Sequence, residues 1–182
     1  YANARSFDAL PFGRANLVLA EQSNDAALLR RSHTACGLLL ADTADIAGAI
    51  EHHTHALRLA SAQDDTVEMS RVWNNIGVAF CVSGSFALAG ACFRRVLVLL
   101  HLESAPVDTR YIAFTNLAHC LYHLGEVQEG LYFANMALKE MTPTFFQQDP
   151  HVALLLHRNC VKLYVAAAQL PEAKRHVDEA VK

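Results

Sequence analysis

The sequence predicts an all-α fold, an α-solenoid of about four to four and a half antiparallel helix hairpins. Three observations favour this fold class. Small residues recur at intervals of about 40 residues, and the apolar residues between them follow the helical period. No alternating pattern long enough for a β-strand is present. A hydrophobic fraction of 53% is ample for a folded core.

The repeat is visible as sets of equivalent positions. The first set is spaced 40, 41 and 43 residues apart and comprises Gly37, Gly77, Ala118 and Val161. Twelve residues after each of these lie Ala49, Ala89, Gly130 and Ala173, and seven further on lie Ala56, Val96, Ala137 and Ala180. Antiparallel helices approach closely only where side chains are short, so these positions predict contacts between helices.

The helical period then places the elements in order. A partial helix is expected before residue 25, and further helices over 26–41, 46–62, 66–82, 86–103, 108–123, 127–141, 149–168 and 172–182. Turns between them are indicated by Asp42-Thr43-Ala44-Asp45, Ser83-Gly84-Ser85 and Leu124-Gly125-Glu126. Asp64-Asp65 predicts a helix start, because an aspartate side chain accepts from free backbone N–H groups there.

This order predicts one repeat domain over residues 1–182. It consists of a partial repeat over 1–24 and repeats over approximately 25–63, 64–104, 105–145 and 146–182. The chain starts at Tyr1 rather than at a methionine and ends inside a predicted helix. We therefore expect it to be a fragment of a longer protein.

The second copy resembles the signature of a known repeat. Trp73-x-x-Ile76-Gly77-x-x-Phe80, followed by Ala89-x-x-x-Phe93, is similar to the tetratricopeptide repeat pattern. In the first copy His53 replaces the aromatic residue. The spacing exceeds the usual repeat of roughly 34 residues, and it resembles the longer repeats of kinesin light chains, of MalT-type and Rap-type bacterial regulators, and of arrays that precede diguanylate cyclase domains. The resemblance implies a right-handed superhelix in which the first helix of each hairpin lines a concave binding face.

Asparagine recurs on those first helices. Asn75, Asn116 and Asn159 each lie two residues before the small residue of their copy, and Asn74 stands beside the first. An amide donates and accepts hydrogen bonds, which suits the backbone of an extended peptide. The arrangement is similar to the asparagine ladder that kinesin light chain repeats use on cargo peptides. Alternatively, these amides tie neighbouring helices together.

Cationic residues share the same predicted face. Arg31 and Arg71 occupy matching positions, and Arg158 and Lys162 lie one helical turn apart. Such a row favours an anionic partner, although solvated surface cations would give the same pattern. With two histidines and one aromatic residue of the third copy, the candidate peptide- or partner-binding groove comprises Arg31, Arg71, Asn74, Asn75, Asn116, His119, Tyr122, His123, Arg158, Asn159 and Lys162.

Several function classes are disfavoured. A net charge of −3 indicates neither nucleic-acid nor membrane binding, and no apolar run approaches the roughly 18 residues of a membrane span. His119 and His123 lack a third metal ligand, and no catalytic or phosphate-binding motif occurs, so we expect no metal, cofactor or enzymatic activity. Five cysteines in apolar runs, without a Cys-x-x-Cys pair, favour reduced thiols in a cytoplasmic protein.

The sequence therefore predicts a non-catalytic module that binds a protein or peptide. The partner is an acidic one if the cationic row lines the groove, and the alternative of solvated surface cations leaves its charge open. We expect a regulatory or sensory input domain of a bacterial signalling protein, such as a diguanylate cyclase or a transcription regulator. A free-standing scaffold for protein assembly and a small-molecule sensor are the alternatives. Because the last predicted helix has no polar capping helix after it, a homodimer through the terminal helices is a further prediction.

Overall fold

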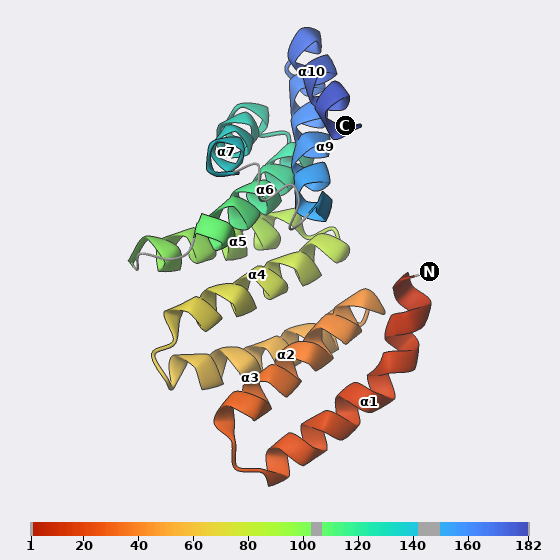
Figure 1. The fold of residues 1–182 in the computed structure, drawn as a ribbon, viewed down its shortest axis with the longest axis vertical. Coiled ribbons are helices and arrows are strands. Elements are labelled where there is room, and N and C mark those ends of the chain that lie inside the picture. Colours follow the sequence, from red (N-terminus) through yellow and green to blue (C-terminus); the bar gives the residue numbers. More distant parts are fainter. Residues whose placement is uncertain (1, 103–106, 142–149, 182) are drawn as a thin grey trace. The chain divides into compact units, whose positions relative to one another are not determined.

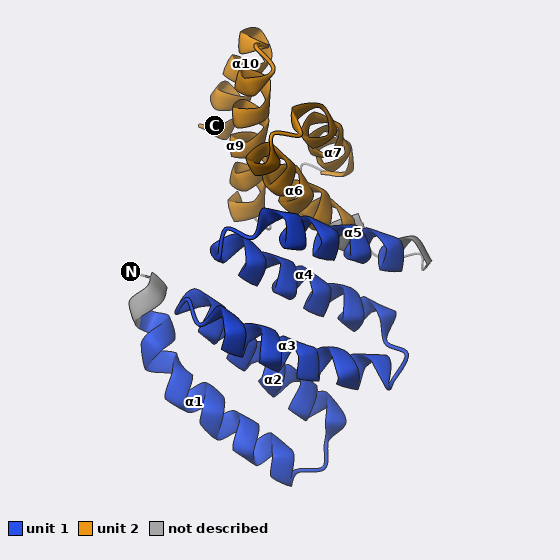
Figure 2. Cartoon of the chain, turned by 180° about the vertical axis from the view of Figure 1, so that it is seen from behind, with its two compact units in different colours: residues 1–103 blue, residues 104–182 orange. Residues whose placement is uncertain are grey.

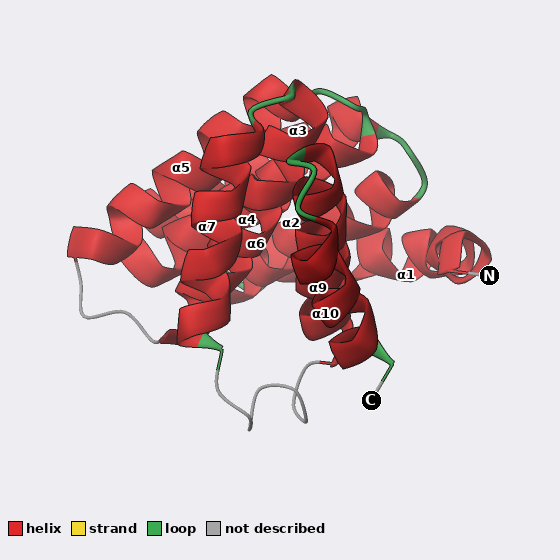
Figure 3. Cartoon of the chain, turned by 90° about the horizontal axis from the view of Figure 1, so that it is seen from above, coloured by secondary structure: helices red, strands yellow, loops and turns green. Residues whose placement is uncertain are grey.

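The structure is a computed structural model that describes residues 2–102, 107–141 and 150–181. Every regular element within these ranges is an α-helix, as Figure 3 shows. The chain divides into two compact units, residues 1–103 (unit 1) and residues 104–182 (unit 2), which Figure 2 colours separately. The single domain over 1–182 stays a prediction.

Unit 1 contains α1 (Ala2–Gln22), α2 (Ala26–Asp42), α3 (Ile46–Ser61), α4 (Thr66–Val82) and α5 (Phe86–Leu102), labelled in Figure 1. Helix α2 pairs with α3 and α4 with α5, while α1 packs on α2 and α3 packs on α4. The four helices predicted from residue 26 onward agree within one residue, although the predicted end at 103 lies outside the described residues. The partial helix predicted before residue 25 is a full helix of 21 residues that continues through Pro11.

Unit 2 contains α6 (Val107–Leu124), α7 (Val127–Glu140), α9 (Pro150–Ala166) and α10 (Leu170–Ala180). Helix α6 pairs with α7 and α9 with α10, and α9 also contacts α6 and α7. Two predicted boundaries were two residues off: α9 ends at 166 rather than 168, and α10 begins at 170 rather than 172. The reason is Ala168, which takes a left-handed φ of 57° and so forms the turn itself. Residues 149 and 182 lie outside the described ranges.

The turns within hairpins reverse the chain through one residue in the left-handed region. Gly84 and Gly125 have φ values of 75° and 77°, which glycine adopts without steric cost, and the two predicted turns are confirmed. Ala44 plays this role between α2 and α3 with a φ of 64°. The predicted helix start at Asp65 is also confirmed, because its Oδ1 accepts a hydrogen bond from the Glu68 backbone N–H at 3.0 Å.

Gly37 and Gly77, two of the small residues of the repeat, lie where helices approach closely, as predicted. A Cβ atom on Gly77 would lie 2.6 Å from the ring of Phe93, which is fully buried in α5. Gly37 has the same relation to His53 of α3, where the distance would be 2.5 Å. His53 thus occupies in the first hairpin the place that Phe93 occupies in the second.

A second position within each hairpin pairs the two helices, and its chemistry varies. In α2 and α3 the pair is His33 and His52, whose Nδ1 atoms lie 3.0 Å apart. In α9 and α10 it is His157 and His176, with the same distance of 3.0 Å between Nδ1 atoms. In α6 and α7 it is Phe114 stacked on Phe133, and in α4 and α5 it is Trp73 and Cys92, which belong to one apolar cluster.

Candidate functional site

The candidate residues all lie on the first helix of a hairpin. Arg31, Arg71, Asn74 and Asn75 lie on α2 and α4 of unit 1. The remaining candidates lie on α6 and α9 of unit 2, and they are Asn116, His119, Tyr122, His123, Arg158, Asn159 and Lys162. Each unit therefore carries its own part of the candidate site.

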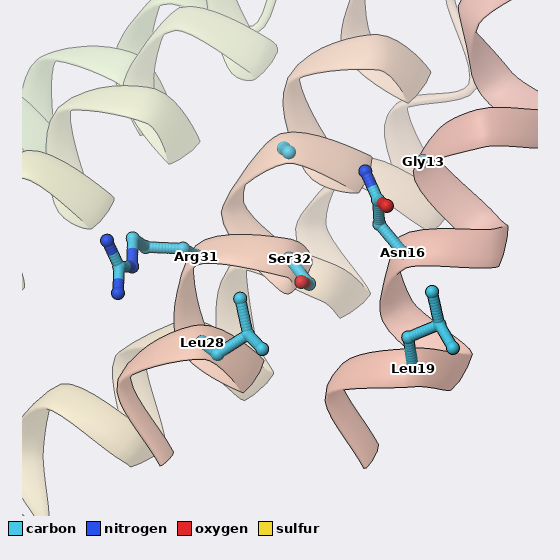
Figure 4. Close-up of a pocket in the computed structure, with 7 residues that line it drawn as sticks. Gly13, Asn16, Leu19, Leu28, Arg31 and Ser32 are labelled. Atoms are coloured by element: carbon cyan, nitrogen blue, oxygen red, sulfur yellow. The ribbon is translucent and has the colours of Figure 1, made fainter. Parts of the chain in front are cut away.

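In unit 1, Arg31 lines a cavity of about 390 Å³ between α1 and α2, drawn in Figure 4. Leu19 and Leu28 give this cavity apolar walls, and Asn16 and Ser32 add polar groups. Arg31 is exposed, and its Nε donates a hydrogen bond to the carbonyl oxygen of Ala27 at 3.3 Å. The cavity combines an apolar lining with one cationic side chain.

The Arg71 side chain already forms an ion pair within the protein, so it is less available to a ligand than its position in the sequence suggests. Its guanidinium pairs with Glu68 on the same helix, and Glu68 also pairs with Arg30 of α2. Arg30 is only 9% exposed and lies 4.0 Å from Asp65 as well, so it ties α2 to α4. Sequence reasoning missed Arg30, although the acidic residues at the start of the next first helix were a usable signal.

In unit 2, the structure brings four candidates together. The Nζ of Lys162 on α9 lies 5.3 Å from the centroid of the Tyr122 ring on α6, a cation–π distance. The rings of His119 and His123 meet edge to face with centroids 4.6 Å apart. Burial, followed by the neighbouring charge of Lys162, lowers the pKa of His123. These residues form a mixed cationic and aromatic surface with the exposed Arg158.

The pKa of His119 reflects the positive charges at this surface. Burial is the main cause that lowers the pKa of His119, and His123, Lys162 and Arg158 lower it further. A hydrogen bond with Asn159 acts in the opposite direction. The neighbouring cations thus make the site a positive environment at neutral pH.

Asn159 has the alternative role, that of tying helices together. It is 1% exposed, its Nδ2 donates to the carbonyl oxygen of Thr115 at 3.1 Å, and its Oδ1 lies 3.3 Å from His119 Nδ1. These contacts join α9 to α6 and leave no surface for a ligand. We therefore remove Asn159 from the candidate site, whereas Asn74, Asn75 and Asn116 are only partly buried.

Replacing Asn159 by alanine is expected to destabilise unit 2 by about 1–3 kcal/mol, because the Thr115 carbonyl would lose a buried donor. Chemical denaturation followed by circular dichroism measures the change. Asn75→Ala, which removes a partly buried amide, serves as the matched control and should cost less. An equal loss in both variants would contradict the assigned role of Asn159.

Other chemistry finds little support in the described part of the chain. Burial raises the pKa of Cys92 to about 11 and of Cys160 to about 12, so both thiols stay protonated at neutral pH. No group of three or more histidine, cysteine or acidic side chains is placed to hold a metal ion among the described residues. None of the described helices is long and apolar enough to cross a membrane.

Comparison with known proteins decides the fold. The chain is similar to the crystal structure of BtubC (BKLC) from P. vanneervenii, with a TM-score of 0.76 and 18% identity over 97% of this chain and 72% of that one. It is also similar to two crystal structures of the TPR-like repeats of a putative kinesin light chain from Podosopora anserina, with TM-scores of 0.74 and 0.73. Both show 12% identity over 98% of this chain and 86% of theirs.

The chain has a tetratricopeptide-like repeat fold. The predicted all-α solenoid is thereby confirmed, and so is the resemblance that the second copy indicated. In this tetratricopeptide-like fold α2–α3, α4–α5, α6–α7 and α9–α10 are the hairpins. No protein-family model matches the sequence, and no curated protein does. At 12% and 18% identity the similarity establishes the fold and not the ligand. The chemistry of the site is therefore the evidence for what the chain binds.

Proposed function

We propose that this chain is a non-catalytic protein- and peptide-binding module, and that the exposed surface of α6 and α9 binds an acidic peptide segment. The observation that carries the proposal is the gathering of Lys162, Tyr122, His119 and His123, with Arg158 one turn from Lys162. A carboxylate placed there would meet two permanent cations. Tyr122 offers an aromatic surface to the neighbouring residue of the peptide.

The two cations have complementary chemistry. The guanidinium of Arg158 presents paired donors that match a carboxylate, while the ammonium of Lys162 acts as a point charge. Arg158 is exposed, and Lys162 is half-buried over the Tyr122 ring, which holds its long side chain in place. A side chain already ordered loses less conformational freedom on binding. The surface is therefore prepared for an anionic partner.

The cavity beside Arg31 offers a second, separate contact in unit 1. Its apolar walls from Leu19 and Leu28 suit an aliphatic side chain, and Arg31 suits a carboxylate next to it. We assign it a secondary role, because one cation lines it, whereas two cations and two histidines converge in unit 2.

Charge reversal tests the surface in unit 2. An array of short random peptides is probed with the wild-type chain and with Arg158→Glu/Lys162→Glu. We expect the wild type to select peptides rich in Asp and Glu, and the variant to bind a subset of them, those held by this surface, at least about tenfold more weakly, since attraction becomes repulsion there. Lys174→Glu/Arg175→Glu changes the net charge equally at exposed positions of α10 and should keep the binding.

The proposal fails if the selected peptides lack acidic residues, or if both charge-reversed variants bind them equally well. Circular dichroism of the variants establishes that the helices are retained.

The setting of the module is also proposed, on the resemblance to long-repeat regulators. A regulatory or sensory input domain of a bacterial signalling protein is our first proposal, with a free-standing scaffold or a small-molecule sensor as alternatives. The amino-acid sequence of the full protein discriminates them, because an adjoining output domain would favour the first.

The predicted homodimer through terminal helices draws support from three exposed apolar residues of the last helix and its end, Leu170, Val177 and Val181. Light scattering over a range of concentrations tests it.

A further inference from the structure

Unit 1 carries a second cavity, which none of the predicted site residues lines. It has a volume of about 510 Å³ and lies where α3, α4 and α5 meet. Leu57, Met69 and Trp73 give it an apolar lining, and Arg58 and Arg95 stand beside them. The volume falls within the range of roughly 300–1,000 Å³ that is typical of ligand sites.

This cavity lies on a different face from the cationic part of the candidate groove. Met69 and Trp73 are each two residues from a groove candidate on α4, namely Arg71 and Asn75. Two residues correspond to a rotation of about 200° around a helix. The cavity and these two groove candidates therefore face opposite sides of α4, and one ligand would not fill both.

The arginines at the cavity have no acidic partner in the described part of the chain. Both are exposed, and no carboxylate there lies within ion-pair distance of Arg58 or Arg95. The nearest acids along α4 are engaged elsewhere, because Glu68 and Asp65 pair with Arg30. Arg58 lies in the last turn of α3, where the helix dipole stabilises its positive charge. Arg95 lies in the interior of α5 and has no such stabilisation.

The apolar lining is held in place by the core. Leu57 and Trp73 are partly buried and pack against the cluster of Ala56, Val72, Ile76 and Cys92. Trp73 therefore lines the cavity while its packing against this cluster holds it in place. A site with an ordered aromatic residue and two flanking guanidiniums fits a ligand that alternates apolar and anionic groups.

We propose that this cavity binds an acidic peptide segment, with an apolar side chain packed on Trp73 and Met69 and with neighbouring carboxylates on Arg58 and Arg95. Charge complementarity selects the peptide, since two cations on a chain of net charge −3 are too few for the phosphate backbone of a nucleic acid. The site is separate from the surface of α6 and α9 and does not depend on the function proposed for that surface.

Trp73 provides the readout, because it is the single tryptophan of the chain. The probe is an acetylated and amidated peptide, Glu-Glu-Leu-Asp-Glu, and its uncharged counterpart is Gln-Gln-Leu-Asn-Gln. We expect the acidic peptide to shift the Trp73 emission in a saturable titration. The uncharged peptide, and the acidic peptide on Arg58→Gln/Arg95→Gln, should each bind about tenfold more weakly because two ion pairs are lost.

A matched variant locates the site. Arg31→Gln/Arg71→Gln removes the same charge from the candidate groove residues of unit 1, which do not line this cavity, and should leave the Trp73 titration unchanged. Arg158→Glu/Lys162→Glu should also leave it unchanged, so failure of the earlier proposal is distinguished from failure of this one.

Four results of the peptide titrations would overturn the inference: no saturable shift, equal affinity for the uncharged peptide, undiminished binding by Arg58→Gln/Arg95→Gln, or the same loss in Arg31→Gln/Arg71→Gln. N-acetylleucine serves as a single-carboxylate probe. If it saturates Trp73 at the same concentration as the peptide, the cavity is a small-acid site and the peptide assignment is wrong.

Discussion

Replacing His53 by phenylalanine is expected to stabilise unit 1, and the gain should grow as the pH falls. His53 is fully buried, and neither of its ring nitrogens has a hydrogen-bond partner among the described residues. An unsatisfied buried polar group costs about 1–3 kcal/mol, which phenylalanine removes. The replacement should fit, because it reproduces on Gly37 the contact that Phe93 makes on Gly77.

The pH dependence follows from the burial of the imidazole. Burial, with a smaller contribution from His52, lowers the pKa of His53 from 6.5 to about 4. The unfolded chain therefore takes up a proton at His53 near pH 6.5, while the folded chain does so only near pH 4. Stability is lost as the pH falls through this window, by an amount on the order of 3 kcal/mol for His53. Burial and the neighbouring His55 and His52 also lower the pKa of His33 to about 4, which adds a loss of the same sign.

Urea denaturation of the wild type and of His53→Phe at pH 7 and pH 4.5, followed by Trp73 emission from unit 1, measures the effect. The exposed His151 provides a control, His151→Phe, for the removal of an imidazole without burial. The explanation is wrong if His53→Phe and His151→Phe lose the same stability on acidification.

Introducing valine at Gly77 is expected to destabilise unit 1 by at least about 3 kcal/mol. Its Cβ would lie 2.6 Å from one carbon of the Phe93 ring and 2.8 Å from the next, and the ring is fully buried. Overpacking of a dense core typically costs about 1–3 kcal/mol, and the two further methyl groups of valine add to the overlap.

Thermal and urea denaturation check this loss, with Ala91→Val at an exposed position of α5 as the control for adding a β-branched residue. If Phe93 is the obstacle, the double variant Gly77→Val/Phe93→Ala should be more stable than the sum of the two single losses predicts. Additive losses would show that the contact with Phe93 does not limit the site.

The helix ranges could be predicted because the signals that set them are local. The apolar period, the glycines of the turns and the capping aspartates act within a few residues of where they stand. The turn at Ala168 was not predicted because alanine carries no turn signal, although Ala168 takes a left-handed φ between the packed helices α9 and α10.

The candidate site was harder to predict because it depends on contacts between copies. Arg30 and Arg31 are adjacent, yet one residue on a helix turns the side chain by about 100°. Arg30 therefore meets α4 while Arg31 remains exposed. Asn159 and Asn116 occupy equivalent positions, but only Asn159 is fully buried, since the helix beside each of them differs. A repeat pattern identifies residues at equivalent sequence positions, but it does not show that their neighbours in the structure are the same.

The residue pair that joins the two helices of each hairpin influences the order in which the protein unfolds. In each unit one hairpin closes on two imidazoles, His33 with His52 or His157 with His176, and the other closes on apolar or aromatic groups. Burial lowers the pKa of all four histidines, so acid weakens this paired position in α2–α3 and in α9–α10. In unit 2, acid also acts on α6–α7, because burial lowers the pKa of His119 on α6. Repeat arrays lose structure element by element when neighbouring elements differ in stability. Acidification would then open α2–α3 before α4–α5, a sequential melting of unit 1 that amide hydrogen exchange can follow residue by residue.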